Sequence, residues 1–419
     1  MKKIIYKILK KSEKITGTDN IYLAKSGFWL GLNNFFQMIS VFAISVIFAN
    51  LLDPATYGQY KYLVSLFGIL SVFSLPAINM TLIQSVARGY EGNLEKSFWE
   101  KLKWSCLGSL IAIILGFYYF WKGNFSLALP VFLAAMFLPV FQASNIYVTF
   151  LNAQKLFKDQ VKYTLINRTI FVVGIILVLF LTRNIFWIFF TYLFLNSLTN
   201  FSLYYWVKNK IKHNQKIDSQ SINYGKHLSF LGLVGGLTSY LDKILIFHYL
   251  GAAPLAIFSF ALSPITQTRG ILNNLPILAV PKLAQKSIPE IETTIKKRFW
   301  QTLILGTIIA VFYVLLIPYL FYIFYPKYIA SIYYSQIMAI LIVLSLPLFY
   351  LSSIVQAKIT LYPKKWFYIS ISRSIIFILY LVPLVKFFGI MGAIIAQIIS
   401  SIIGYLYFYI GWKWFLKKE

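Results

Sequence analysis

Apolar stretches long enough to cross a lipid bilayer recur along the whole chain of 419 residues. A hydrocarbon core of about 30 Å requires roughly 20 consecutive helical residues. Because 59% of the residues are hydrophobic and only 12% are charged, no stretch remains between these segments for a separate soluble domain. The sequence therefore predicts an all-α integral membrane protein with about twelve transmembrane helices.

These helices are expected to form two lobes of six. The first stretch is too long for a signal-peptide core, so we expect it to remain as the first helix. The predicted organisation is a tail at 1–26, a lobe at 27–207, a loop at 208–226, a lobe at 227–412 and a tail at 413–419. The predicted helices lie at 27–49, 61–84, 104–121, 126–150, 164–182, 185–207, 228–250, 255–280, 299–325, 331–357, 366–386 and 389–412.

The distribution of positive charge predicts the orientation of the helices. Of the 39 Lys and Arg residues, 30, including Lys101, fall in the tails and the even-numbered connections. The opposite side holds only Lys61, Lys122, Arg183, Lys327 and Lys386. The positive-inside rule then places both termini in the cytoplasm. The net charge of +27 is thus explained by topology and attraction to anionic membrane lipids, and nucleic acid is not an expected partner.

Residues for catalysis or metal binding do not form a recognisable set. The single cysteine, Cys106, has no partner for an internal disulfide, and the three histidines lack the spacing of metal ligands. The sequence contains no nucleophile with a matching base, no paired carboxylates and no G-x-x-x-x-G-K-[ST] loop. We therefore expect no enzyme, no metal and no cofactor, with H⁺ or Na⁺ as a candidate coupling ion.

An internal repeat is indicated by two segments that lie 205 residues apart. Tyr163-Thr-Leu-Ile-Asn-Arg-Thr-Ile170 is similar to Tyr368-Ile-Ser-Ile-Ser-Arg-Ser-Ile375, so that Arg168 corresponds to Arg373. Six helices per half would give parallel repeats related by an axis along the membrane normal, an arrangement found in many transporters. Chance similarity between two apolar helices is the alternative.

Several short segments resemble the O-antigen and polysaccharide flippases, the Wzx-like family of the multidrug/oligosaccharidyl-lipid/polysaccharide exporter superfamily. They are Ala49-Asn-Leu-Leu-Asp-Pro-Ala-Thr-Tyr-Gly-Gln-Tyr60, Leu241-Asp-Lys-Ile-Leu-Ile246 with Leu250-Gly251, and Pro281-Lys-Leu-Ala284. Gly58 fits the family pattern. The turn that corresponds to it in the second half of the chain, Leu250-Gly-Ala-Ala-Pro-Leu-Ala-Ile-Phe258, has Ala256 at this position. The resemblance implies a MATE-like fold in a bacterial inner membrane. It also implies a flippase that carries undecaprenyl-pyrophosphate-linked oligosaccharide between leaflets by alternating access, alongside other polysaccharide-assembly membrane proteins.

Charged residues inside the predicted helices are the candidate site residues, because a charge at membrane depth normally faces protein or a water-filled cavity. They are Lys243, Arg269, Arg168 and Arg373, which would bind the pyrophosphate, and Asp242, which would couple transport to an ion. Guanidinium groups suit phosphate oxygens through their bidentate geometry. Snorkelling of Lys243, Arg168 and Arg373 to lipid headgroups is the competing interpretation. Adjacent on a helix, Asp242 and Lys243 point about 100° apart, so each is expected to need another partner.

Two other functions remain open on the sequence. A drug or small-cation exporter of the same fold would need an acidic or apolar cavity, which the four cations inside helices do not favour. A membrane glycan polymerase or ligase would usually carry a large extracytoplasmic loop, whereas every predicted outer connection is short. Gly232, Gly235 and Gly236 are predicted to allow the seventh helix to bend or to pack closely.

Overall fold

The protein is described here by a computed structural model, which covers residues 20–277, 283, 286–358 and 363–413. Every regular element in these ranges is a helix, as the sequence predicts. Eight of the helices are long and apolar enough to cross a membrane, or ten when each of two interrupted pairs is taken as one span. The count of twelve helices and the cytoplasmic location of both termini stay predictions. Apart from Leu283, the segment Pro281-Lys-Leu-Ala284 falls outside the described residues, as do most of the two tails.

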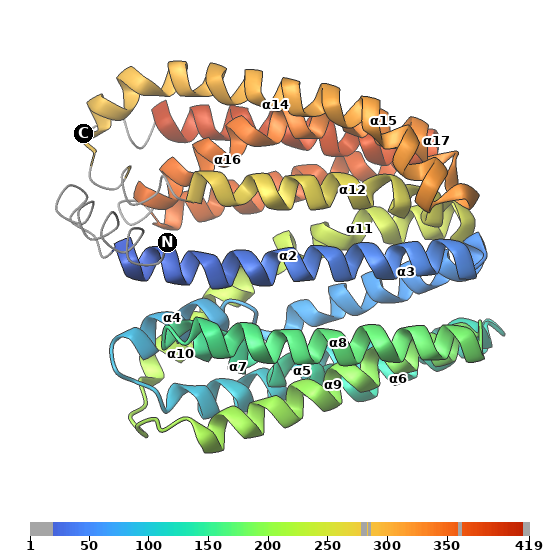
Figure 1. Ribbon diagram of the computed structural model, residues 1–419, viewed down its shortest axis with the longest axis horizontal. Helices are drawn as coiled ribbons and strands as arrows, with labels where there is room; N and C mark the ends of the chain where they lie inside the picture. Colours follow the sequence, from blue (N-terminus) through green and yellow to red (C-terminus); the bar gives the residue numbers. More distant parts are fainter. Residues whose placement is uncertain (1–19, 278–282, 284–285, 359–362, 414–419) are drawn as a thin grey trace, which may run out of the picture. The chain divides into compact units, whose positions relative to one another are not determined.

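The chain divides into two compact units, of which unit 1 comprises Met1–Ser45 and Leu70–Phe230. Within unit 1, α5 packs along α6 and α8 packs along α9 (Figure 1). Its helices are most of α2 (Asn20–Leu51), then η1 (Ser71–Ser74), α4 (Ile78–Ala87), α5 (Asn93–Trp121), α6 (Phe125–Ser144), α7 (Ile146–Ala153), α8 (Phe157–Leu181), α9 (Ile185–Lys210) and α10 (Ser219–Leu231).

Unit 2 comprises Val46–Ile69 and Leu231–Glu419. Within it, α11 packs on α17 and α14 packs on α16. Besides the end of α2, its helices are α3 (Pro54–Leu70), α11 (Leu233–Leu250), α12 (Ala252–Ile277), α14 (Ile288–Phe324), η2 (Pro326–Tyr328), α15 (Ser331–Met338), α16 (Ile340–Lys358) and α17 (Pro363–Gly411). Gly389, with φ 57°, interrupts α17 close to the predicted boundary between the last two helices.

The units differ from the predicted lobes in two segments. Residues 46–69 belong to unit 2, because Tyr57 stacks on Phe260 at 4.4 Å between ring centroids and Gly58 fits closely against Ala252. A Cβ at Gly58 would lie only 1.8 Å from the Ala252 carbonyl oxygen, so this close approach requires glycine. Residues 208–230 belong to unit 1. Such pairings between distant segments leave no periodic signal in the sequence.

Two predicted helices are interrupted where these segments end. The predicted helix at 61–84 breaks between α3 and α4, at Leu75, whose φ of 57° is left-handed and whose neighbour Pro76 cannot continue a helix. The seventh helix breaks at Gly232, between α10 and α11, as the glycine there allows. The break at Leu75 lies in unit 1 and the break at Gly232 lies in unit 2, each a few residues after the chain passes from one unit to the other.

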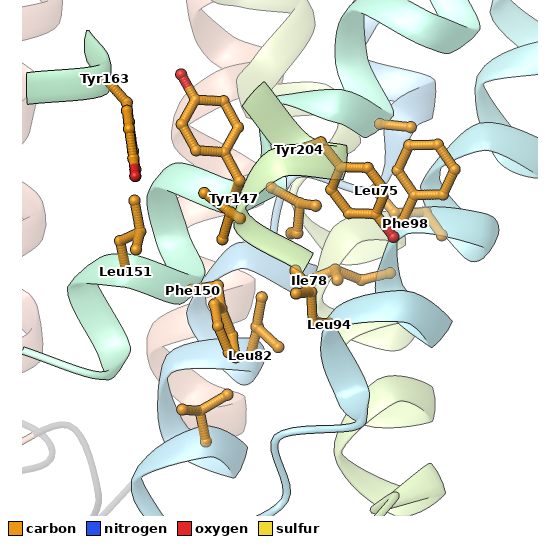
Figure 2. Close-up of a cluster of buried hydrophobic side chains, with 14 residues drawn as sticks. Leu75, Ile78, Leu82, Leu94, Phe98, Tyr147, Phe150, Leu151, Tyr163 and Tyr204 are labelled. Atoms are coloured by element: carbon orange, nitrogen blue, oxygen red, sulfur yellow. The ribbon is translucent and has the colours of Figure 1, made fainter. Parts of the chain in front are cut away.

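An apolar core holds α4, α5, α7, α8 and α9 of unit 1 together (Figure 2). Phe98 and Tyr204 stack with centroids 4.2 Å apart, and Tyr147 and Phe150 are almost fully buried. Side chains of this size each contribute a few kcal/mol by leaving a polar environment. The Trp206 indole donates to the Tyr163 hydroxyl at 3.1 Å, so that Tyr163 joins the core edge. By contrast, its repeat counterpart Tyr368 is 70% exposed, so the repeat rests on sequence alone.

Candidate functional site

The candidate site residues fall into both units. Arg168 lies in α8 of unit 1 and is partly buried. Lys243 on α11, Arg269 on α12 and Arg373 on α17 all belong to unit 2, together with Asp242. Unit 2 therefore gathers three of the four predicted cations and the predicted coupling carboxylate.

Arg269 and Arg373 come together within unit 2, although 104 positions separate them in the chain. The positive charge of Arg373 acts on the Arg269 guanidinium. Arg373 donates to the Ser400 carbonyl oxygen at 3.1 Å, and the Nε of Arg269 is buried without a hydrogen-bond partner among the described residues. A buried donor without an acceptor is costly, and an anion at this position would supply the missing acceptor.

Gly404 creates space for one of these guanidinium groups. A Cβ at this position would lie 3.3 Å from the Cζ of Arg373, closer than ordinary van der Waals contact. Gly270, which follows Arg269 in the sequence, has no such role, because a Cβ at this position would meet nothing within 4 Å. Ser400 and Gly404, one turn apart on α17, therefore both lie beside the Arg373 guanidinium.

Asp242 and Lys243 contact each other, which the sequence analysis did not expect. The Lys243 ammonium lies 3.4 Å from Asp242 Oδ1, and the backbone amide of Lys243 donates to the same oxygen at 2.8 Å. They meet although they point about 100° apart, because the long lysine stem spans the angle between adjacent positions. The expectation of a further partner is confirmed for Asp242, whose Oδ2 accepts a hydrogen bond from Gln397 at 2.9 Å.

Lys61 is a member of this region that the sequence analysis missed. The ammonium lies over the Tyr57 ring, 5.4 Å from its centroid. The sequence suggested a helix that starts at Lys61, whereas α3 starts at Pro54. Proline suits the first helical position, and the Asp53 carboxylate caps the Thr56 amide at 3.0 Å. That cap and proline were the signal that could have placed Lys61 inside the helix.

Lys101 is a second cation that the sequence misplaced. It was assigned to a cytoplasmic connection before residue 104, but α5 starts at Asn93 and Lys101 is only 3% exposed. The ammonium donates to Asn79 Oδ1 at 3.1 Å. The error arises because charged residues in the first turns of α5 conceal the start of the helix. This buried lysine of unit 1 has a neutral amide as its acceptor.

The predicted inter-lobe loop is held to unit 1 by polar contacts. Arg88 forms an ion pair with Asp218 at 2.8 Å, and the side chain of Asn93 pairs with the Asp218 backbone in both directions. Donation from the Ser221 hydroxyl and amide, together with Arg88, holds the pKa of Asp218 below its ordinary value. Two further ion pairs join Lys208 to Glu95 and Lys226 to Glu100.

The described residues contain no group of three His, Cys, Asp or Glu side chains that would suit a metal ion. Both oxygens of Asp242 face N–H donors, which complement a carboxylate anion rather than bring further oxygen ligands to a cation. The role of Asp242 in ion coupling and the choice between H⁺ and Na⁺ stay predictions.

Comparisons with known proteins agree with this architecture. Residues 23–286 match the model of a family described as polysaccharide biosynthesis protein. No curated protein sequence matches the chain. A multidrug resistance MATE family transporter in an inward-facing conformation is similar in structure, with a TM-score of 0.65 and 12% identity over 91% of this chain and 96% of the other.

Two further solved structures have the same fold. One is the lipid II flippase MurJ, with a TM-score of 0.62, 16% identity and coverage of 91% of this chain and 87% of MurJ. The other is a transporter of the MOP superfamily from Pyrococcus furiosus, with a TM-score of 0.56, 13% identity and coverage of 91% and 94%. The chain is therefore a multi-pass membrane protein with a MATE-like fold, and it belongs to the polysaccharide biosynthesis protein family.

Proposed function

We propose that the chain is a flippase in a bacterial inner membrane. It moves an undecaprenyl-pyrophosphate-linked oligosaccharide from the cytoplasmic to the outer leaflet by alternating access, and it performs no catalysis. The family description concerns polysaccharide biosynthesis, and the similar MurJ is a lipid II flippase, which supports a lipid-linked substrate. Other polysaccharide-assembly membrane proteins would supply and consume this substrate.

The observation that most strongly supports the proposal is the presence of Arg269 and Arg373 in the same region of unit 2. Two guanidinium groups whose positive charges influence each other favour an anionic ligand, and the buried Nε of one of them has no hydrogen-bond partner among the described residues. A diphosphate offers several charged oxygens to such a pair, and arginine binds phosphate oxygens in a bidentate manner. The headgroup of a polyprenyl-linked sugar is a ligand with this chemistry.

The remaining predicted site residues have assigned roles in this proposal. Lys243 and Arg168 bind the same anionic headgroup at other points of its path, and Asp242 couples transport to H⁺ or Na⁺. No bound cofactor is required, because movement is driven by an ion gradient, by membrane potential or by removal of the product.

The second candidate is an ion-coupled drug exporter, favoured by the similarity in fold to a multidrug MATE transporter. Such a protein would bind cations, which the positive charge of Arg269 and Arg373 opposes. A glycan polymerase or ligase is the third possibility. All three can be separated by where the lipid-linked unit accumulates.

The decisive experiment uses the native host with this gene deleted, complemented either by the wild type or by Arg269→Gln. Loss of surface polysaccharide with the lipid-linked unit trapped on the cytoplasmic leaflet supports the flippase. Units that accumulate on the outer leaflet would point to a polymerase or ligase. Unchanged surface glycan would overturn the proposal and favour a small-molecule exporter.

A further inference from the structure

The last two turns of α9, in unit 1, border a cavity. Its volume is about 490 Å³, within the usual range for sites that bind small molecules. The described residues that line this cavity are Ser202, Tyr205, Trp206, Asn209 and Lys210. They recur at intervals of three and four positions, so they share one face of the helix. The cavity therefore combines two aromatic rings with a hydroxyl, an amide and an ammonium group.

Trp206 is held in place within this cavity. Its indole N–H donates to the hydroxyl of Tyr163, a side chain of α8 that is 7% exposed. The Lys210 ammonium lies over the Trp206 ring, 4.9 Å from the ring centroid. Lys162 lies over the Tyr163 ring in the same way, at 5.9 Å. Cation–π attraction thus holds two ammonium groups on two rings that a hydrogen bond joins.

These two lysines have no counter-charge. Neither Lys162 nor Lys210 forms an ion pair in the part of the chain that the structure describes. By contrast, Lys208 on the same turn as Lys210 pairs with Glu95 at 3.0 Å. Both unpaired lysines are exposed, so an external anion can reach them. The local surplus of positive charge favours an anionic ligand at the cavity.

An exposed apolar stripe runs along α9 from this cavity. Its side chains, again three and four positions apart, are Phe194, Leu198, Phe201 and Tyr205. From Phe194 to Tyr205 the helix rises about 17 Å, at about 1.5 Å per residue. This length is close to one leaflet, which is half of a hydrocarbon core of about 30 Å. A ligand with an anionic head and acyl chains would cover both the cavity and the stripe, whereas a water-soluble anion would leave the stripe bare.

We infer that this cavity binds the headgroup of an anionic glycerophospholipid, with the phosphate at Lys210 and the acyl chains along the stripe. Tryptophan, tyrosine and lysine side chains are common at the depth of lipid headgroups. Ser202 and Asn209 offer a hydroxyl and an amide to the glycerol hydroxyls of a headgroup such as that of phosphatidylglycerol. General attraction of loop lysines to a membrane would require neither a cavity nor a fixed indole. The inference goes beyond the proposed function and does not depend on its substrate.

Native mass spectrometry of the purified full chain in a non-ionic detergent, titrated with phosphatidylglycerol, tests this inference. We expect one phosphatidylglycerol to bind at least tenfold more tightly than phosphatidylcholine, whose headgroup has no net charge. Lys210→Gln and Trp206→Leu should each reduce this preference at least fivefold. Lys122→Gln is the matched control, because Lys122 also adjoins an exposed tryptophan, Trp121 at the end of α5 in unit 1, and it should keep the full preference.

Equal affinity of the wild type for the two lipids would overturn the inference, and so would an unchanged preference in Lys210→Gln. An equal loss of preference in Lys122→Gln would also overturn it, because charge alone would then explain the binding. Lys210→Gln changes an exposed side chain, so its result decides the matter even if Trp206→Leu fails to fold. Farnesyl diphosphate should displace phosphatidylglycerol only at concentrations at least tenfold higher. Displacement at lower concentrations would assign the cavity to a polyprenyl-linked ligand and refute the phospholipid as its occupant.

Discussion

Unit 1 and unit 2 use their positive charges differently. At one end of unit 1, basic side chains meet carboxylates in three ion pairs, Arg88–Asp218, Lys208–Glu95 and Lys226–Glu100, at 2.8 to 3.0 Å. Within the helices of unit 2, Lys61, Arg269 and Arg373 form no ion pair in the described part of the chain. These basic groups near the inter-lobe loop are neutralised by their neighbours, whereas in unit 2 only Lys243 has a carboxylate partner among the four cations of its helices named here.

The cost of the two arrangements explains this difference. A partly exposed ion pair is worth roughly 0–1 kcal/mol, and three of them with their hydrogen bonds hold a loop in place. A cation buried in an apolar environment without a counter-charge destabilises the fold, and such groups commonly serve a function. The unpaired cations of unit 2 are therefore the better guide to the ligand.

The largest effects are expected from variants of Arg269. Arg269→Gln leaves a shorter polar side chain but removes the charge, so export of the lipid-linked unit should fall at least tenfold. The double variant Lys243→Ala and Arg269→Ala should lose export entirely while it still inserts at normal levels. Surface polysaccharide in the complemented deletion host measures both.

Arg298→Gln is the matched control for this prediction. Arg298 is an exposed arginine on α14 of unit 2 that donates to Gln301 at 3.1 Å. Its replacement should leave export unchanged. Normal export from the double variant would remove the distinction drawn between the two units.

Lys101 is a buried cation of unit 1, so variants of this residue test whether buried cations have different roles in the two units. We expect Lys101→Ala to lower the free energy of unfolding by about 2 kcal/mol, because the stem packing is lost and Asn79 Oδ1 is orphaned. Lys101→Met retains the stem volume and should cost less. Thermal unfolding of the purified protein measures the loss of stability.

A measurement of export should distinguish the role of Lys101 from that of Arg269 and Arg373 in unit 2. If Lys101 serves only the packing of α4 and α5, Lys101→Met restores surface polysaccharide to the wild-type amount. Loss of export from a stably inserted Lys101→Met would show that unit 1 also carries a functional buried cation.

The ion pair of Arg88 and Asp218 gives a pH-dependent prediction. Folding lowers the pKa of Asp218 below the value of about 3.9 that it has in the unfolded chain. The contribution of the Asp218 carboxylate to stability is therefore fully present above the unfolded pKa and is lost as the pH falls through the folded pKa. The melting temperature of the wild type should exceed that of Asp218→Asn from pH 7 down to about pH 4. The difference should shrink below that pH, and a difference that persists unchanged at lower pH would contradict it.

The helices could be predicted from the sequence because apolar stretches of membrane-spanning length are a strong signal. Their starts could not always be predicted. Asp53 with Pro54 and the charged first turns of α5 begin helices with polar residues, so Lys61 and Lys101 were both placed outside. A hydropathy pattern weights the apolar centre of a helix and misses its polar beginning.

The site was only partly predictable for a different reason. Arg269 and Arg373 were selected as charges at membrane depth, which needs only local sequence. Their pairing depends on how α12 and α17 pack, and no local pattern records it. The same holds for Gln397, a neutral side chain whose contact with Asp242 is set by the packing of α11 on α17.

The smallest effect is expected from Gly404→Ala, which tests whether the position of Arg373 matters as well as its charge. The added methyl group would lie 3.2 Å from Leu348 Cδ2 and 3.3 Å from the Arg373 guanidinium carbon, so both side chains must give way by a few tenths of an ångström. Export should fall by less than about threefold, since the charge is retained and a shifted guanidinium can still bind phosphate oxygens. Gly270→Ala, next to Arg269, adds the same methyl group where nothing lies within 4 Å and should have no effect. Equal export from both variants would show that unit 2 requires the charge of the arginine pair but not its geometry.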